Sequence, residues 1–270
     1  MNKFTYSILF LLLFMSSAYA QRHELGVFAG GSYYLGDLNP SGHFAQSKPA
    51  VGIIYRYNMN PRWALRVNAL FGSVEGSDAL DNKNNPRNLS FKSPITEFSV
   101  LTELNFLQFY TKSERYMFSP YIFAGLGIFN FNPQAQYEGK WYELQPLGTE
   151  GQTATGKSLY ALTSVSVPFG IGIKIGLFKA VCLGLEWGMR KTFTDYIDDV
   201  STTYVNPNSF NQIHDSYVSI ARILADRSEV KHVEGAQRGN SSNNDWYNFY
   251  GLTLSFHLGN KEVVCPAFSK

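Results

Sequence analysis

The sequence predicts an all-β fold, a single antiparallel, up-and-down transmembrane β-barrel of about eight strands. Three observations lead to this prediction. Apolar and polar residues alternate with a period of two in eight segments, the charges of these segments all fall on the polar face, and the connections alternate between short and long. Such alternation is typical of strands with one buried or lipid-facing side. The 16% aromatic content suits either a secreted β-protein or an outer-membrane barrel, so the pattern has to decide between them.

The amino end of the chain is expected to be a signal peptide. Lys3 supplies a positive charge, residues 8–15 are apolar, and Ala18-Tyr19-Ala20 fits a small-x-small cleavage site. The apolar stretch is too short to be a membrane helix. We therefore expect export by the Sec route, cleavage near Ala20, a barrel over residues 21–258, and a periplasmic tail over residues 259–270.

The first four strands are expected at residues 24–35, 51–58, 63–72 and 97–106. One face of each contains no charge. In order along the chain, these faces are formed by Leu25, Val27, Ala29, Tyr33 and Leu35; by Val51, Ile53, Tyr55 and Tyr57; by Trp63, Leu65, Val67, Ala69 and Phe71; and by Phe98, Val100, Leu104 and Phe106. β-Branched and aromatic residues favour pleated strands. Each segment is therefore predicted to be a strand of about ten residues.

The last four strands are expected at residues 121–128, 165–175, 181–190 and 250–258, and they follow the same rule. Their apolar faces are formed by Ile122, Ala124, Leu126 and Ile128; by Val165, Val167, Phe169, Ile171, Ile173 and Ile175; by Val181, Leu183, Leu185, Trp187 and Met189; and by Tyr250, Leu252, Leu254, Phe256 and Leu258. No apolar face of the eight carries a charged residue.

The connections decide between a soluble sandwich and a membrane barrel. Residues 58–62, 107–117 and 176–180 are short, whereas residues 36–49, 73–94, 132–163 and 191–245 are long. A soluble fold has no reason to collect its long loops at one end, whereas outer-membrane barrels have short periplasmic turns and long extracellular loops. Aromatic residues near strand ends are expected to form interfacial girdles: Tyr57, Trp63, Phe106, Tyr121 and Phe256.

The polar faces predict a plugged lumen. They carry four acids and four bases, which we call the lumen charge network: Glu24, Arg56, Arg66, Glu97, Glu103, Lys174, Glu186 and Arg190. An eight-stranded barrel is just wide enough for its own side chains, and an unpaired charge there costs several kcal/mol. The network is therefore expected to pair internally and to make the barrel structural rather than porin-like.

The two cysteines allow two readings. Cys182 is expected near the periplasmic rim, and Cys265 lies in the tail that follows the last strand. Because the flanking strands are neighbours in an oxidising compartment, the two sulfur atoms form a possible disulfide. The alternative is two unrelated thiols.

The long loop 191–245 raises the question of a metal site. Asp195, Asp198 and Asp199 are candidate calcium ligands, but their spacing lacks an EF-hand pattern. The alternative is a solvated acidic cap or partners for Arg and Lys, and no metal or cofactor is predicted. Residues 217–227 have the apolar spacing of a short helix that packs across a barrel mouth. No spacing singles out a catalytic group, so the protein is predicted not to be an enzyme.

Several stretches resemble one family along nearly the whole mature chain. They are FAGGSYYLGDLNP (28–40), YNMNPRWALR (57–66), SPITEFSVLTELNF (93–106), PYIFAGLGIFNFNP (120–133), LGTEGQ (147–152), RKTFTDYIDDVSTTY (190–204) and RGNSSNNDWYNFYGLTLSF (238–256). They are similar to the PorG-like outer-membrane barrels of Bacteroidota, which are associated with type IX secretion, a protein transport system, and with gliding motility. The motif loop of this family corresponds to Thr192, Phe193, Thr194, Asp195, Tyr196, Asp198 and Asp199.

The resemblance implies an outer-membrane component that anchors or contacts a periplasmic PorK/PorN-like ring. Two alternatives remain: a small OmpA/OmpX-like structural or adhesive surface barrel, and a narrow channel or lipid-handling enzyme. The formal net charge of +2 gives no reason to expect a nucleic-acid partner. Outer-membrane lipid is the expected environment.

Overall fold

A computed structural model of the chain describes residues 22–80, 87–110, 117–152, 158–178, 180–212 and 215–258. The expected signal peptide and the expected tail with Cys265 lie outside these ranges, so both stay predictions.

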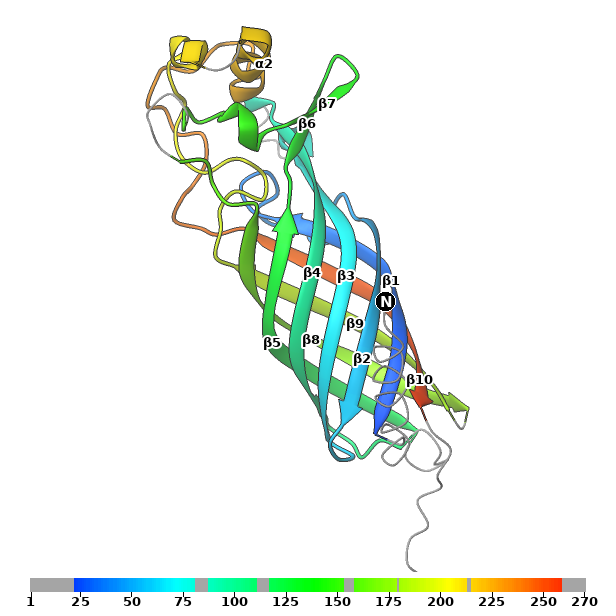
Figure 1. The fold of residues 1–270 in the computed structure, drawn as a ribbon. Helices are drawn as coiled ribbons and strands as arrows, with labels where there is room; N and C mark the ends of the chain where they lie inside the picture. Colours follow the sequence, from blue (N-terminus) through cyan, green and yellow to red (C-terminus); the bar gives the residue numbers. More distant parts are fainter. Residues whose placement is uncertain are drawn as a thin grey trace, which may run out of the picture.

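Eight antiparallel strands close into a barrel (Figure 1). They are β1 (His23–Leu35), β2 (Lys48–Asn58), β3 (Trp63–Ser77), β4 (Ser90–Asn105), β5 (Phe118–Phe131), β8 (Thr163–Phe178), β9 (Val181–Thr192) and β10 (Trp246–Leu258). Neighbours in sequence are neighbours in the sheet, β1 pairs with β10, and an additional β3–β4 pairing completes the ring. The predicted up-and-down topology is confirmed.

The strands are longer than the expected ten residues, because most continue past the apolar segment at the long-loop end. β4 begins at Ser90 instead of residue 97, and β3 runs to Ser77 instead of residue 72. The pairs continue from Gly72↔Ile95 up to Ser77↔Ser90. The expected loop 73–94 is therefore much shorter, since strand pairing satisfies its backbone hydrogen bonds beyond the apolar segment.

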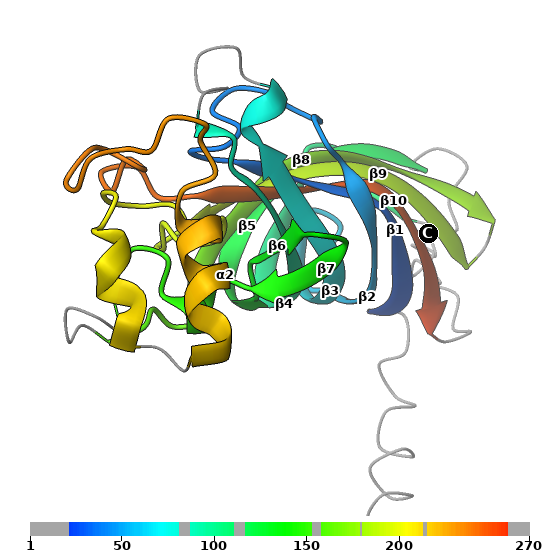
Figure 2. The same ribbon diagram turned by 90° about the horizontal axis from the view of Figure 1, so that it is seen from above.

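Most of the long connections fold into a layer over one end of the barrel. We call the described part of it the loop layer (residues 78–80, 87–89, 132–152, 158–162, 193–212 and 215–245). It contains the hairpin β6 (Gln134–Tyr137) and β7 (Lys140–Glu143), the 3₁₀ turns η2 (Asp78–Leu80), η4 (Gln145–Leu147) and η5 (Pro207–Gln212), and the helix α2 (Asp215–Ala225). Figure 2 shows α2 and the β6–β7 hairpin on this side of the barrel. The helix agrees with the expected segment 217–227, whereas the hairpin was not anticipated.

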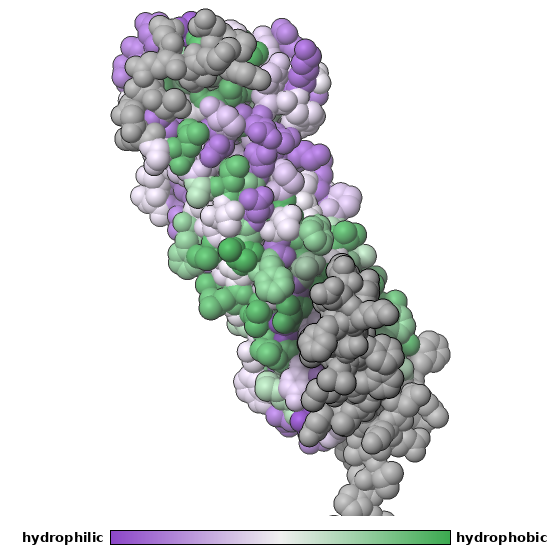
Figure 3. All heavy atoms as spheres, in the orientation of Figure 1, coloured by the Kyte–Doolittle hydropathy of each residue, from purple (hydrophilic) through white to green (hydrophobic). Residues whose placement is uncertain are grey.

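Side chains alternate between the outside and the lumen in the expected register. Outward residues such as Val51, Leu126 and Ile171 are 57%, 71% and 57% exposed, whereas their inward neighbours are buried or half-buried. We call the exposed apolar wall the apolar belt: Leu25, Val27, Val51, Ile53, Leu65, Phe71, Phe98, Val100, Ile122, Leu126, Ile128, Val165, Ile171, Ile173, Leu185, Leu252 and Phe256. On the face seen in Figure 3, hydrophobic residues gather over the barrel wall and hydrophilic ones over the loop layer.

Part of the predicted aromatic girdle is wrong. Trp63, Phe106 and Phe256 are exposed on the outside, but Tyr121 is 1% exposed and faces the lumen. The parity of β5 explains this, because Tyr121 shares a face with Phe123 and alternates with the outward Ile122. Among the described residues, none of the helices has both the length and the apolar character needed to cross a membrane.

A hydrophobic core joins the upper lumen to the loop layer, a feature that the sequence analysis did not anticipate. Inward residues of the strands, such as Phe91, Phe129 and Phe249, belong to one cluster with Leu147, Val200 and Leu224 of the loop layer. Burial of such side chains contributes about 1.5–3 kcal/mol each. The loop layer is therefore packed onto the barrel as part of the same domain.

Candidate functional site

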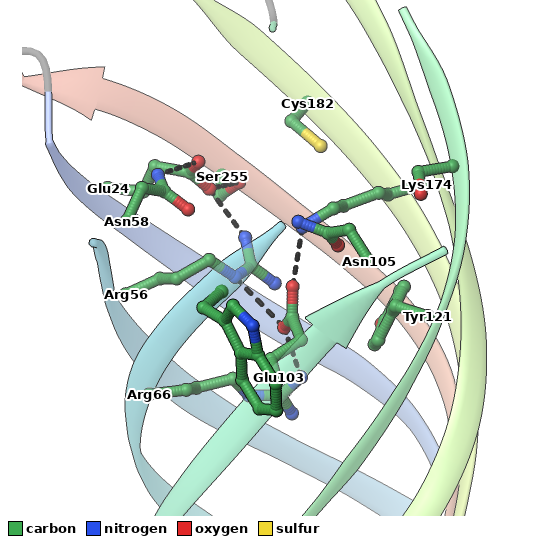
Figure 4. A network of polar contacts seen from close by, with 12 residues as sticks. Glu24, Arg56, Asn58, Arg66, Glu103, Asn105, Tyr121, Lys174, Cys182 and Ser255 are labelled. Carbon is green, nitrogen blue, oxygen red and sulfur yellow. Dashed lines mark hydrogen bonds and ion pairs between the residues drawn. The ribbon is translucent and has the colours of Figure 1, made fainter. Parts of the chain in front are cut away.

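The lower lumen is filled by charged side chains that the barrel register brings together (Figure 4). Arg56 is the cross-strand partner of both Glu24 and Arg66. Two arginines directly opposite each other destabilise a sheet, and Glu103 offsets this by lying between them. Its Oε2 atom is 3.1 Å from Arg56 Nε and 3.7 Å from Arg66 Nη1.

The remaining contacts of this lower group pair every charge. Arg56 Nη1 is 2.5 Å from Glu24 Oε2, and Lys174 Nζ is 2.5 Å from Glu103 Oε1. His257 Nε2 lies 3.1 Å from Glu24 Oε1 and closes the group toward the short-turn end. The four side chains of Glu24, Arg56, Glu103 and Lys174 are at most 2% exposed.

A second pair spans the lumen between strands far apart in the sequence. Arg66 donates two parallel hydrogen bonds to Glu186, from Nη1 and from Nη2, each 2.7 Å long. Tyr121 donates to the same carboxylate at 2.9 Å. Bidentate guanidinium–carboxylate pairs are among the strongest charged hydrogen bonds, so this pair ties β3 to β9 across the barrel.

A third pair lies on the side of the apolar core. Arg190 Nε is 3.0 Å from Glu97 Oε2, and Tyr247 donates to the same oxygen at 2.9 Å. The Arg190 guanidinium also stacks over the ring of Phe249 at 4.8 Å from its centroid. The charged lumen therefore passes directly into the aromatic core above it.

All eight residues of the lumen charge network thus face the interior and are nearly completely buried. Their chemistry is that of structural pairing: each acid contacts a base, and Tyr121 and Tyr247 supply further hydrogen bonds. Together with the apolar core above, these side chains occupy the interior of the barrel.

The motif loop meets the amino end of β10 through a tyrosine of β1. The hydroxyl oxygen of Tyr34 is 2.5 Å from Asp198 Oδ2 and 2.8 Å from Asp245 Oδ1. A hydroxyl has one proton to donate, so the second short contact requires a proton on one of the carboxyl groups. Burial, followed by the charge of neighbouring carboxylates, raises the pKa of Asp198 and of Asp245 well above the usual range.

Asp199 lies in a separate group with an arginine. Arg238 Nη2 is 3.6 Å from Asp199 Oδ2, and its Nη1 is 3.0 Å from Glu150 Oε1. Tyr160 donates to Asp199 at 2.7 Å, and Thr149 donates to its other oxygen. Burial raises the pKa of Asp199 to about 6 although Arg238 acts in the opposite direction.

Asp195 differs from its neighbours because neither of its carboxyl oxygens has a hydrogen-bond partner, although the residue is only 6% exposed. Burial raises the pKa of this group to about 8 although the nearby Ser201 side chain acts in the opposite direction, and the carboxylates of Asp37 and Glu150 add to the rise. The expected solvated acidic cap is therefore wrong, since Asp195, Asp198 and Asp199 are all buried. The other reading, partnership with an arginine, holds for Asp199. Across the described ranges, no three or more His, Cys, Asp or Glu side chains are arranged to hold a metal ion.

Four partners of the motif loop escaped the sequence analysis: Tyr34, Glu150, Arg238 and Asp245. All four lie in stretches that carry the family resemblance, namely FAGGSYYLGDLNP, LGTEGQ and RGNSSNNDWY. The sequence signal that could have found them is this shared resemblance, because motifs that are far apart in a sequence are often neighbours in the fold.

A serine, a histidine and an aspartate meet in the loop layer without the geometry of a catalytic triad. Ser228 Oγ and Asp226 Oδ2 both lie near His232 Nδ1, at 3.2 and 3.3 Å. A triad places the serine on the opposite ring nitrogen from the aspartate. Ser228 also donates to Asp226 itself, so these contacts shape the loop.

Cys182 is buried on the lumen side of β9, near the short-turn end and close to Glu24 and Arg56 (Figure 4). Its partner in the possible disulfide, Cys265, lies outside the described residues. The pairing therefore stays a prediction.

Residues 3–216 match the family described as "Domain of unknown function (DUF6089)". This match covers most of the chain, and the chain belongs to that family. No curated protein matches it in sequence.

Solved structures similar to this chain are bacterial β-barrels at very low sequence identity. Neisserial surface protein A is 9% identical, with a TM-score of 0.44, covering 87% of this chain and 97% of its own. Ail, the attachment invasion locus protein of Yersinia pestis, is also 9% identical, with a TM-score of 0.42 and coverage of 87% and 96%. The N-terminal β-barrel domain of Pseudomonas aeruginosa OprF is 12% identical, with a TM-score of 0.36 and coverage of 86% and 96%.

Proposed function

We propose that this DUF6089 barrel spans an outer membrane and acts there as a non-conducting, non-enzymatic structural anchor. The observation that carries the proposal is the pairing of an apolar outer wall with a filled, charge-paired lumen. In water, a continuous apolar wall of this size is a liability. In a bilayer it is the required surface, and a closed barrel satisfies every strand hydrogen bond there.

The height of the wall fits a membrane. His23 and Tyr57 are cross-strand partners at the lower rim, and Gly31 lies on the row of Tyr250 and Trp187 at the upper rim. Eight residues at ~3.3 Å each and a tilt of ~40° span roughly 20 Å. This is close to the ~25 Å apolar band of outer-membrane barrels.

The lumen supports a mechanical role over transport. An ion or a solute has to displace paired charges in the lower half and then an apolar core in the upper half. Both layers are held by contacts between strands that lie across the barrel from each other. Contacts across the interior make the barrel rigid, and a rigid barrel is suited to hold other proteins at a fixed place in the membrane.

The finer assignment is a role in type IX secretion, in which the barrel anchors or contacts a PorK/PorN-like periplasmic ring. It is supported by the resemblance of TFTDYIDDVS and NNDWY to PorG-like barrels of Bacteroidota. The contact surface is expected at the short-turn end, where residues 59–62 and 106–110 connect the strands.

Crosslinking in native membranes followed by purification of the barrel tests this assignment. Ring proteins in the purified complex, and loss of secreted cargo in a deletion strain, are the expected results. Normal secretion in the deletion strain would contradict the secretion role and leave the membrane-spanning barrel untouched.

A second candidate is an OmpA/OmpX-like structural or adhesive surface barrel. It is favoured by exposed apolar side chains at the outer end, where Trp141, Val230 and Val233 are 50%, 84% and 76% exposed. Reduced surface attachment of a deletion strain that secretes normally would support this candidate over the first.

A further inference from the structure

The loop between β1 and β2 does not rise away from the barrel but folds down its outer wall. Tyr33 points outward from β1, yet it is 0% exposed because residues of this loop cover it. Its ring lies 5.0 Å from that of Phe44 and 5.9 Å from that of His43, and its hydroxyl is 3.1 Å from His43 Nδ1.

Two other outward aromatic residues complete the contact. Phe44 meets Tyr250 of β10 edge to face, with centroids 5.0 Å apart. Trp187 of β9 donates from Nε1 to the Tyr33 hydroxyl at 2.8 Å. The tip of the loop thus packs on three neighbouring strands, β1, β10 and β9. The wall residues that it contacts are the amphipathic aromatic side chains of Tyr33, Tyr250 and Trp187.

The strand register shows at which height of the barrel wall the loop makes this contact. The outward row of Leu252 and Leu185 belongs to the apolar belt, and the next row upward contains Tyr250 and Trp187. The row above those contains Tyr33, Asn248 and Met189, and the next contains Leu35, Trp246 and Lys191. Tyr and Trp side chains that first mix with Asn and Lys above a purely apolar wall are typical of the boundary between hydrocarbon and headgroups.

Phe44 lies at this boundary and is 52% exposed, so half of its ring has no partner within the described chain. Its backbone has a φ of +61°, a left-handed conformation that is unfavourable for a bulky residue. Gln46 has a φ of +51° as well. Strain at two neighbouring residues indicates that the loop is shaped to present this side chain.

The rest of the loop is rigid enough to hold that presentation. Asn39 donates from Nδ2 to the carbonyls of Tyr34 and Gly42 and accepts from the Gly42 N–H at 2.9 Å. Ser47 donates to the Phe44 carbonyl at 2.8 Å. The Phe44 side chain is therefore preorganised, and it loses little conformational freedom when it is buried in a lipid bilayer.

We infer that residues 36–47 form a membrane-interface anchor, in which Phe44 inserts at the headgroup–acyl boundary of the outer leaflet. We infer lipid as the partner of the exposed Phe44 ring because the wall residues that hold the loop are continuous with the apolar belt directly below them. The inference rests on the proposed membrane-spanning function and adds a second lipid-contacting element to the strands. It assigns the loop to holding the barrel at a fixed depth.

Depth-dependent quenching of an environment-sensitive dye tests the anchor. In a Cys182→Ser, Cys265→Ser background, the dye NBD is attached to Phe44→Cys, to Val230→Cys in the loop layer, or to Val27→Cys in the belt. The labelled proteins are placed in phosphatidylcholine vesicles with lipids that carry a nitroxide at carbon 5 or carbon 12. Retention of the barrel is checked by its heat-modifiable migration in gels.

The expected result is at least twofold quenching at position 44 by the shallow nitroxide and weaker quenching by the deep one. Position 27 should be quenched by both, and position 230 by neither. If position 44 behaves like position 230 while position 27 is quenched, the anchor is refuted and the membrane-spanning barrel stands. If position 27 is also unquenched, the proposed function itself fails.

A further variant tests the contact of the loop with the wall. Tyr250→Ser removes the wall ring against which the side chain at position 44 packs, and it should reduce quenching of the dye at position 44 without changing quenching at position 27. Full quenching at position 44 in this variant would refute the placement of this loop position by the wall residues.

Discussion

Glu103 balances three cations in the lower lumen. Its two oxygens contact Lys174 and Arg56, and Arg66 is within 3.7 Å. Removing one member of a buried ion group leaves charges without compensation in a low dielectric. This residue is therefore where a single substitution should weaken the barrel most directly.

Glu103→Gln is expected to destabilise the barrel by about 3–5 kcal/mol, measured by urea unfolding in lipid vesicles and followed by tryptophan fluorescence. The matched control is Glu75→Gln, because the partly exposed pair of Glu75 and Lys48, 2.7 Å apart, contributes at most about 1 kcal/mol. Equal effects of the two substitutions would show that Glu103 has no special place in the lumen.

The buried carboxyl group of Asp195 predicts a pH dependence of the loop layer. Its pKa is raised from 3.8 to about 8 in the folded protein, so the folded state binds more protons than the unfolded state between these values. The sign follows from linkage: the contribution of this group to stability is complete below about pH 4 and is lost as the pH rises through 8.

Hydrogen exchange of the loop layer should therefore become faster, after correction for the intrinsic rate, as the pH rises from about 5 to 9. Asp195→Asn should reduce this dependence, because an amide does not titrate. Asp226→Asn is the control, since hydrogen bonds to this carboxylate lower its pKa in the folded state. An unchanged pH dependence in Asp195→Asn would contradict the assignment.

At the scale of elements, the barrel closes where β1 meets β10. Gly30 and Gly251 are direct partners at this seam. A Cβ atom on Gly251 would be 2.5 Å from the Ala29 carbonyl oxygen and 2.6 Å from the Gly30 Cα atom. Backbone atoms cannot move aside as a flexible side chain can, so this close approach requires glycine.

Gly251→Val is expected to lower the yield of folded barrel severalfold in refolding from urea into lipid vesicles, measured by heat-modifiable migration. Ala29→Val places the same valine side chain on the exposed outer face of the same seam, and this variant should refold as the natural chain does. A normal yield for Gly251→Val would mean that the seam can widen without loss of closure.

At the scale of the whole molecule, two layers of buried side chains lie along the barrel axis, and we propose that they block it. The lower layer is the lumen charge network, and the upper one is the apolar core shared with the loop layer. Purified protein in planar bilayers is therefore expected to give no channel steps above the baseline, beside an open porin as the positive control. Discrete conductance steps would overturn the plugged-barrel proposal.

The fold was predictable because its signal is local. The positions that face lipid and those that face the lumen follow from a period of two, so Val27 and Glu24 could be assigned to opposite faces without any partner being known. Strand ends were less predictable. β4 gains seven residues because it pairs with β3 beyond the apolar segment, and that pairing has no signature in the residues themselves.

The candidate site was predictable only in part. The sequence placed the eight charges of the network in the lumen, but not which acid meets which base, because Arg66 and Glu186 meet across the barrel at a separation of 120 residues. The acidic motif loop was misjudged for the same reason. Asp198 is buried by Tyr34 and by the loop layer, which lie far from it in the chain.

By itself, the sequence determined the barrel, the orientation of each strand face and the end that bears the long loops, because these depend on alternation and spacing along the chain. Only the tertiary structure decided the pairing of charges, the burial of the three aspartates and the descent of the loop with Phe44 onto the outer wall. These depend on closure, since the shear and tilt of the closed barrel set which distant side chains share one level.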